Sequence, residues 1–194
     1  MVETNGDTAP GASLVKEVLF TEEQVTARVN EMALEIIELY RDKDPLFIGL
    51  GRGGIKFTAE LMSAMVKLDP DFHPEVDYIT ASTYGRGDTA GETKILNGLN
   101  PHTEVKGRIV IVIDDVLDTG ATTPPIIEDL YKSEATAVDL VVFIEKDVER
   151  PNGPVPKLVG FRAPNEWLIG MGMDYAEKGR WLGFIATMNQ PASA

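Results

Sequence analysis

Cysteine is absent from this chain of 194 residues. Its absence excludes disulfides, thiolate metal sites and cysteine nucleophiles. Histidine is nearly absent as well, because His73 and His102 are the only two. Both lie in polar segments beside proline and share no metal-ligand spacing, so we expect them to be surface loop residues.

Positive charge is also scarce. The chain has 18 Lys and Arg against 31 Asp and Glu, a formal net charge of −13. This balance disfavours binding to nucleic acid or to an anionic membrane. The N-terminus lacks a signal pattern, and no apolar run approaches the roughly 18 residues that a membrane span requires. We expect a soluble cytoplasmic protein with no nucleic-acid or membrane partner, in which a locally basic site meets any anionic substrate.

An apolar content of 43% over 194 residues suits one α/β domain. Residues 1–13 are predicted to be a disordered tail, residues 14–190 a single domain and residues 191–194 a frayed tail. Helices are predicted at 21–44, which starts with a capping box, 55–67 and 124–132. Strands are predicted at 46–50, 76–82, 109–113 and 138–144, with short ones at 157–161, 167–170 and 183–188. The alternation predicts a mostly parallel twisted sheet flanked by helices, with a smaller terminal region.

The most informative segment is IVIVIDDVLDTGATT, residues 109–123. Its five consecutive β-branched residues do not alternate with polar ones, which suits a strand covered on both faces. Asp114 and Asp115 follow at the carboxyl end of this strand, where open α/β sheets bind ligands. The turn at 118–122 would present hydroxyl and backbone N–H groups to an anion at the start of a helix. The segment predicts a phosphate site beside paired carboxylates that face hydroxyl groups or a metal ion.

The glycines of GLGRGG, residues 49–54, form a competing motif. G-x-G-x-x-G between a strand and a helix is typical of dinucleotide-binding folds. Such folds also place an acidic residue at the end of the second strand, whereas here that strand ends in Thr-Ala-Ser. A nicotinamide enzyme is therefore disfavoured. The same glycines suit a tight turn that brings N–H groups and Arg52 to a pyrophosphate.

Four more segments accompany the DDxxDTGxT pattern, in the order GRGGIKFTAEL (51–61), STYG (82–85), IEKDVER (144–150) and VGFRAPNEWLIGMGMDYAEKGR (159–180). Together they resemble the hypoxanthine-guanine branch of the phosphoribosyltransferases over nearly all of residues 14–188. The resemblance implies a type I phosphoribosyltransferase fold with a small hood built from the terminal segments, Mg²⁺ as cofactor and a homodimer or homotetramer. It implies purine salvage, in which phosphoribosyl pyrophosphate and a 6-oxopurine base, hypoxanthine or guanine, give IMP or GMP plus pyrophosphate.

The resemblance also assigns roles to individual residues. It implies that Asp118 is the general base at purine N7 and that Asp174 binds Mg²⁺, with Asp114 and Asp115 on the ribose-bound ion directly or through water. The phosphoribosyl group would be held by Asp114, Asp115, Thr119, Gly120, Ala121 and Thr122. Pyrophosphate would be held by Arg52, Gly53 and Arg180, and the purine by Lys146, Trp167 and Leu168. Residues 83–98, with Thr83 and Tyr84 at their start, would form a mobile lid.

The chemistry of the residues supports these roles but leaves alternatives open. The Lys146 ammonium is a donor without acceptor capacity, so it favours a ring carbonyl over a ring amine. Trp167 precedes an apolar run and would also suit the core, and Asp174 would also suit the surface. The family usually has Leu-Lys where this chain has Gly51-Arg52, with a non-proline cis peptide at that junction. Thr83 replaces the usual Ser, Trp167 the usual Phe or Tyr, and Ala121 adds only a backbone N–H to the phosphate turn.

Two other functional classes remain. A regulatory nucleotide sensor on this fold would keep the phosphate turn but would not need Asp118, Lys146 and Asp174 together. A purely structural α/β domain would not need acids and glycines at its strand ends. The sequence does not rank hypoxanthine, guanine and xanthine as substrates, nor does it give the oligomeric state.

Overall fold

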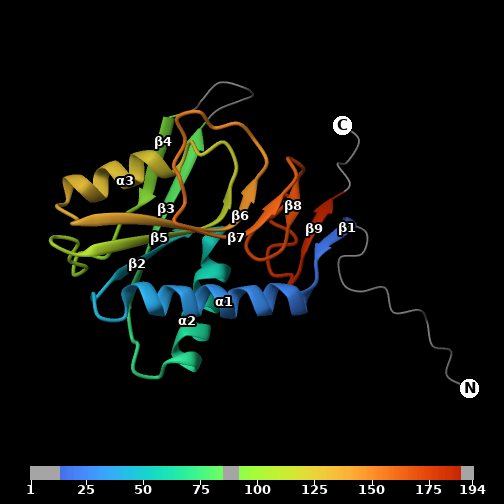
Figure 1. Cartoon of the computed structure of the whole chain (residues 1–194). Coiled ribbons are helices and arrows are strands. Elements are labelled where there is room, and N and C mark those ends of the chain that lie inside the picture. The colour runs from blue at the N-terminus through green and yellow to red at the C-terminus, as the bar shows by residue number, and fades with distance from the viewer. Residues whose placement is uncertain (1–13, 85–91, 189–194) are drawn as a thin grey trace, which may run out of the picture.

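A six-stranded sheet forms the centre of the computed structural model, which describes residues 14–84 and 92–188 (Figure 1). The expected tails lie outside the described residues. Across the sheet the strands are β4 (Glu92–Asn97), β3 (Glu75–Tyr84), β2 (Leu46–Gly51), β5 (Ile109–Leu117), β6 (Ala137–Lys146) and β7 (Leu158–Ala163). Neighbouring strands are parallel except β3 and β4, which are antiparallel. The predicted mostly parallel sheet is confirmed.

Helices cover both faces of this sheet. α1 (Glu22–Tyr40) and α2 (Gly54–Leu68) lie on one face, and α3 (Thr123–Lys132) lies on the other (Figure 1). Ile111 and Ile113 of β5 pack in the cluster that includes α1 and α2, whereas Val110 and Val112 pack in the cluster that includes α3. Burial on both faces explains why this strand shows no alternation of apolar and polar residues.

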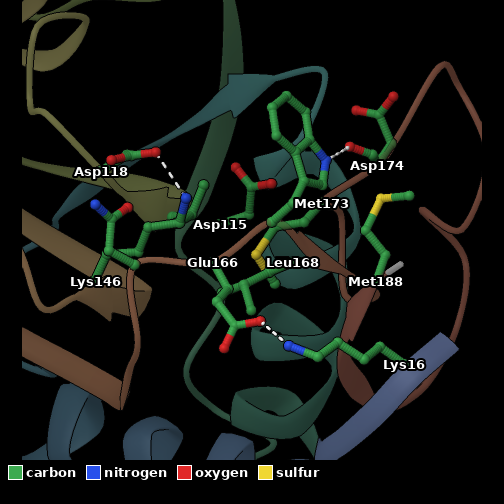
Figure 2. Close-up of a pocket in the computed structure, with 12 residues that line it drawn as sticks. Lys16, Asp115, Asp118, Lys146, Glu166, Leu168, Met173, Asp174 and Met188 are labelled. Atoms are coloured by element: carbon green, nitrogen blue, oxygen red, sulfur yellow. Dashed lines mark hydrogen bonds and ion pairs between the residues drawn. The ribbon is translucent and has the colours of Figure 1, made fainter. Parts of the chain in front are cut away.

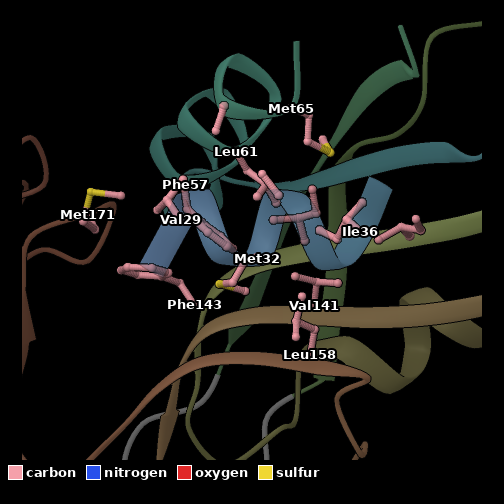
Figure 3. Packing of buried hydrophobic residues seen from close by; sticks show 14 of the residues in the cluster. Val29, Met32, Ile36, Phe57, Leu61, Met65, Val141, Phe143, Leu158 and Met171 are labelled. Carbon is pink, nitrogen blue, oxygen red and sulfur yellow. The ribbon is translucent and has the colours of Figure 1, made fainter. Parts of the chain in front are cut away.

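The larger core cluster centres on α1. Val29, Met32 and Ile36 of α1 lie between α2 and the sheet, close to Leu61 of α2 and Val141 of β6 (Figure 3). All five side chains are at most 4% exposed. The helix packs here because its apolar residues recur at helical spacing and form one buried face.

α1 begins as the sequence predicts and ends earlier. The Thr21 hydroxyl accepts a hydrogen bond from the Gln24 N–H, and the Gln24 side chain accepts one from the Thr21 N–H, which confirms the capping box. The helix ends at Tyr40, not near Asp44. The Tyr40 hydroxyl donates to Asp139 of β6 at 2.7 Å, and Asp44 has a positive φ of 44° that no helix continues through.

A second, three-stranded antiparallel sheet forms the predicted hood. Its order is β1 (Val15–Phe20), β9 (Ile185–Met188) and β8 (Leu168–Ile169). Leu168 and Ile185 also belong to the main core cluster, so the hood is packed onto the domain. The sequence did not predict β1, because its burial does not alternate and three consecutive residues in it are exposed. Only pairing with the distant strand β9 defines it.

The prediction of an irregular loop over residues 83–98 is wrong for its two ends. β3 continues to Tyr84, and β4 pairs with it antiparallel from residue 92 to residue 97. β4 is an edge strand in which Ile95 and Leu96 are exposed. Backbone pairing at a sheet edge does not require alternating burial, which is why the pattern missed it. Residues 85–91, the middle of the expected lid, lie outside the described residues.

Both histidines lie at the surface. His73 and His102 are exposed, as expected of loop residues. Within the part of the chain that the structure describes, no helix combines the length and apolarity that crossing a membrane requires.

Candidate active site

The site is built at the carboxyl edge of the parallel sheet, around the end of β5. Asp114 and Asp115 lie within β5, near its end at Leu117. The sequence analysis predicted that this strand ends at residue 113. Asp115 is 7% exposed, and its backbone N–H donates to the Asp114 carboxylate at 3.0 Å. Burial raises the pKa of Asp114 well above its ordinary value, and the charge of Asp115 adds to the effect. Burial also raises the pKa of Asp115, although hydrogen bonds from Asp114 and from backbone N–H groups, and the charge of Arg180, oppose the effect. Adjacent carboxylates, of which Asp115 is buried and Asp114 is partly buried, favour a cation or hydroxyl donors beside them.

Two glycines bring other segments close to Asp115. A Cβ on Gly53, at the start of α2, would lie 2.3 Å from a carboxylate oxygen of Asp115. Gly172 of the hood has a φ of 111°, and a Cβ there would lie 2.0 Å from the Gly53 carbonyl oxygen. Glycine is therefore required at both positions for this approach. The Gly51–Arg52 peptide before this turn is cis, as in the family that the sequence resembles.

The turn after β5 lines a cavity of about 260 Å³. All residues from Asp114 to Thr123 contribute to its wall, together with Gly51 at the end of β2 and Gly53 in the turn after it. Gly120 takes a φ of 75°, which glycine adopts without strain. α3 begins directly after this turn, so its positive dipole end and the turn's N–H groups favour an anion there. The structure thus brings together the residues predicted to bind a phosphoribosyl group.

Lys146, the last residue of β6, reaches the same edge. Its ammonium forms an ion pair with Asp118 at 2.8 Å, and the Lys146 side chain is only 11% exposed. The two residues meet because β5 and β6 are parallel neighbours, paired up to Leu117 and Glu145. The pair offers a donor and a carboxylate acceptor side by side.

Arg150 supports this pair, and the sequence analysis gave it no role. One guanidinium nitrogen donates to the backbone carbonyls of both Asp118 and Lys146, each at 3.0 Å. The other donates to Glu145 at 2.8 Å. Arg150 thereby ties the turn after β5 to the end of β6. The available signals were its place four residues after Lys146 and its position at the end of the IEKDVER segment.

A larger cavity of about 800 Å³ lies beside the first and shares three wall residues with it: Asp115, Val116 and Asp118. Figure 2 shows the Lys146–Asp118 pair at its left side and Asp174 with Met188 at its right. The hood supplies most of the remaining wall, including Trp167, Leu168 and Met173. The cavity therefore lies between the central sheet and the hood and is open to solvent on one side.

Trp167 lines this cavity and does not lie in the core. It is 49% exposed, and its indole N–H donates to the Asp174 carbonyl at 3.0 Å. Its ring meets Tyr175 edge to face, with centroids 5.8 Å apart. Leu168 is buried on β8, the edge strand of the hood among the described residues, so one side of its backbone faces away from the sheet.

The cavity also contains residues that sequence reasoning missed. Lys16 of β1 forms an ion pair with Glu166 at 2.7 Å, and both line the wall with Asn165 and Met188 (Figure 2). Lys16 is 150 positions from Glu166 in the chain, and no local pattern connects them. The β1–β9 pairing alone brings Lys16 to the site.

The charged groups of the hood form a network around Arg180. Arg180 is 13% exposed and donates to the Asp174 carboxylate at 2.6 Å and to the Gly172 carbonyl at 2.5 Å. Glu177 accepts from Arg180 at 3.3 Å and from Arg52 at 2.5 Å. Arg52 and Arg180, both predicted to bind pyrophosphate, thus share one carboxylate. Asp174 is held by its neighbours and is not a free surface acid.

The carboxylates of the site could bind Mg²⁺ only together with substrate oxygens or water. No group of three or more acidic or histidine side chains suited to a metal occurs among residues 14–84 and 92–188. Mg²⁺ is commonly held by one or two carboxylates together with substrate phosphate oxygens and water. Asp174 on one side and the Asp114–Asp115 pair on the other are such carboxylates, so the site suits an ion that arrives with a phosphorylated substrate.

The lid residues are only partly described. Thr83 and Tyr84 end β3, where they pair with Thr93 and Glu92 of β4. Their backbone is therefore part of a hairpin. The proposed closing movement stays a prediction.

Sequence comparisons match this chain to phosphoribosyltransferases. The family described as "Phosphoribosyl transferase domain" matches residues 17–176. A hypoxanthine-guanine phosphoribosyltransferase of Streptococcus mutans is 33% identical over 178 residues, covering 91% of this chain and 94% of that protein. The enzyme of the same name from Bacillus subtilis is 31% identical over 175 residues, covering 90% and 93%.

Solved structures agree with these relatives. The crystal structure of a hypoxanthine phosphoribosyltransferase from Staphylococcus aureus superposes with a TM-score of 0.85 at 28% identity, covering 95% of this chain and 97% of that one. A hypoxanthine phosphoribosyltransferase of Trypanosoma cruzi, in a ternary substrates complex, gives a TM-score of 0.80 at 26% identity and covers 90% and 96%.

Proposed function

Because the chain belongs to the hypoxanthine-guanine phosphoribosyltransferase family, we propose that it transfers the 5-phosphoribosyl group of phosphoribosyl pyrophosphate to N9 of hypoxanthine or guanine. The products are IMP or GMP and pyrophosphate, and the role is purine salvage. The observation that carries this proposal is the pair of adjoining cavities that meet at Asp115, Val116 and Asp118. One has the chemistry for a sugar phosphate and the other for a planar base, and a bond between the two ligands would form where the cavities meet.

The smaller cavity is the proposed phosphoribosyl site. The 5′-phosphate would lie against the turn of residues 119–122 at the start of α3, where backbone N–H groups and the helix dipole favour an anion. Asp114 and Asp115 would accept hydrogen bonds from the ribose hydroxyls. Those bonds would compensate two carboxylates whose charged forms burial disfavours.

The larger cavity is the proposed purine site. The Lys146 ammonium would donate to the carbonyl at purine position 6, and the Asp118 carboxylate would accept the proton at N7. The exposed indole face of Trp167 would stack on the ring, and the backbone of Leu168 would meet its edge. The Lys146–Asp118 ion pair suits this task because a 6-oxopurine offers the complementary acceptor and donor.

Arg52, Gly53 and Arg180 are proposed to hold the pyrophosphate. When the C1–O bond breaks, negative charge develops on this leaving group and positive charge on the ribose ring. The guanidinium groups of Arg52 and Arg180 would stabilise the former. N9 of the purine then forms the new bond to C1, while the N7 proton passes to Asp118. Mg²⁺, held by Asp174 and the Asp114–Asp115 pair, would supply further charge neutralisation when bound.

A turnover assay tests the proposal. The protein is incubated with magnesium, phosphoribosyl pyrophosphate and, in separate reactions, guanine, hypoxanthine, xanthine or adenine, and nucleotide formation is followed by ultraviolet absorbance. We expect turnover with hypoxanthine or guanine and almost none with adenine. Nucleotide binding without turnover for any base would favour the regulatory sensor instead. Light scattering would test the proposed homodimer or homotetramer, and the cytoplasmic location stays a prediction.

A further inference from the structure

Glu177 lies between the two arginines of the proposed pyrophosphate site. One carboxylate oxygen accepts from Arg52 at 2.5 Å, and the other accepts from Arg180 at 3.3 Å. The two arginines come from distant segments, Arg52 from the turn between β2 and α2 and Arg180 from the hood. The Glu177 carboxylate therefore bridges two arginines that come from different segments of the chain.

A strained turn places Glu177 in this position. Tyr175 and Lys178 exchange backbone hydrogen bonds of 3.0 and 2.9 Å around Ala176 and Glu177, whose φ angles are 48° and 65°. Positive φ at both central residues defines a type I′ turn, which normally selects Asn and Gly. Side chains in this conformation cost free energy, and such strain concentrates at functional sites. The Glu177 N–H also donates to the Asp174 carboxylate at 2.8 Å, which anchors the turn to the site.

Carboxylates and phosphates bind the same N–H edge of a guanidinium group. Both accept its N–H groups in the same forked geometry, so they compete for one arginine. On the premise of the proposed function, we propose that Glu177 is an internal competitor of pyrophosphate. Glu177 pairs with Arg52 and, beside Asp174, with Arg180 in the free protein. It is displaced when the diphosphate binds and pairs with the arginines again when pyrophosphate leaves.

Exposure of the contact makes this exchange feasible. The side chains of Arg52 and Glu177 are 65% and 59% exposed, so water can replace either partner. Exposed ion pairs are weak, and their loss shifts affinities only modestly. Removal of the competing charge should therefore tighten pyrophosphate binding by about threefold to tenfold.

The test compares Glu177→Gln with wild-type protein by isothermal titration calorimetry, using pyrophosphate in the presence of magnesium. Glu177→Gln keeps the side chain length and the backbone but removes the charge. Glu134→Gln is the matched control, because Glu134 also has a positive φ of 63°, is 65% exposed and pairs with Lys106 at 2.7 Å. It precedes β6 and therefore lies at the opposite end of the parallel sheet. We expect Glu177→Gln to bind more tightly and Glu134→Gln to bind as the wild type does.

Two further measurements separate competition from a general change in local charge. IMP carries the base and the 5′-phosphate but no diphosphate, so its affinity should be unchanged in Glu177→Gln. In an Arg52→Gln background, one contested cation is missing, so the effect of Glu177→Gln on pyrophosphate affinity should shrink.

The outcomes distinguish this inference from its premise. Equal or weaker pyrophosphate binding by Glu177→Gln, with wild-type protein that does bind pyrophosphate, would overturn the competition. An equal gain in affinity for IMP would also overturn the competition, because such a gain would reflect a general change in the electrostatic potential of the site. Wild-type protein that binds no pyrophosphate at all would instead contradict the proposed function.

Discussion

Replacement of Lys146 by Met tests how the proposed purine site chooses its base. Met keeps much of the apolar stem but removes the ammonium that pairs with Asp118 at 2.8 Å. A 6-oxopurine would lose a charged donor to its carbonyl. Adenine has an amine at the same position, so in the wild type two donors would face each other, and the substitution removes that conflict.

The structure sets the expected magnitude. Lys146 is 11% exposed, so its hydrogen bond to the purine would form away from bulk water. Hydrogen bonds to charged groups contribute about 1.5–3 kcal/mol, which corresponds to roughly 10- to 150-fold in kcat/KM. The Asp118 side chain is 45% exposed, so water can solvate it after its partner is lost. We expect kcat/KM for hypoxanthine to fall by about 10- to 100-fold, while kcat/KM for adenine stays the same or rises.

The assay measures kcat/KM for hypoxanthine, guanine and adenine at saturating phosphoribosyl pyrophosphate. Lys56→Met is the matched control, because Lys56 is 13% exposed and forms an ion pair with Glu60 within α2. It should keep the preference of the wild type. If Lys146→Met retained the full preference for 6-oxopurines, or if wild-type protein used adenine as well as guanine, Lys146 would not select the base.

Three other predictions concern the carboxylates. Asp118→Asn should lower kcat by about 100-fold with little change in affinity for phosphoribosyl pyrophosphate, because it removes the proposed base at N7; a variant with near-normal kcat would contradict the role. Gly53→Ala should weaken binding of phosphoribosyl pyrophosphate in calorimetry, because the new methyl group would lie 2.3 Å from an Asp115 carboxylate oxygen and would push the carboxylate aside. Gly98→Ala should have no effect, because no atom lies within 4 Å of the position of its methyl group. Burial alone would raise the pKa of Asp77, but hydrogen bonds from a threonine hydroxyl and two backbone N–H groups lower it overall. Its stabilising effect is therefore present above the unfolded pKa of about 3.9 and lost as the pH falls through the lower folded value, so urea unfolding of wild type and Asp77→Asn should converge below about pH 4.

The central sheet could be predicted because its strands are buried on both faces. β5 and β6 are apolar runs bounded by polar turns, and their carboxyl ends lie together in any parallel arrangement. The sequence therefore predicts Asp114, Asp115 and Lys146 at one edge of the sheet. β1 and β4 were missed because an edge or hood strand is stabilised by backbone pairing with a distant segment, and no alternating pattern marks it.

The sequence indicated which residues would gather at the candidate site, but not most of the contacts between them. The strand ends and the phosphate turn are local features, and their spacing alone indicates their chemistry. Lys16 and Glu166 meet only through the β1–β9 pairing, so composition and periodicity contain no trace of their ion pair. The two side chain-to-carbonyl bonds of Arg150 likewise require the turn after β5 to lie against the end of β6.

In the hood, unusual backbone conformations place the charged residues of the candidate site. Met171, Ala176 and Glu177 all take positive φ without being glycine, and no propensity rule predicts this. Their conformations turn the segment back so that Asp174 and Arg180 form an ion pair at 2.6 Å, while Gly172 contacts Gly53. The same turns bring Glu177 to Arg52, 125 positions away in the sequence. In a chain with a net charge of −13, the proposed pyrophosphate site thus has Arg52 paired with Glu177, and Arg180 paired with both Asp174 and Glu177. On the inference above, the diphosphate would compete with the Glu177 carboxylate for these arginines.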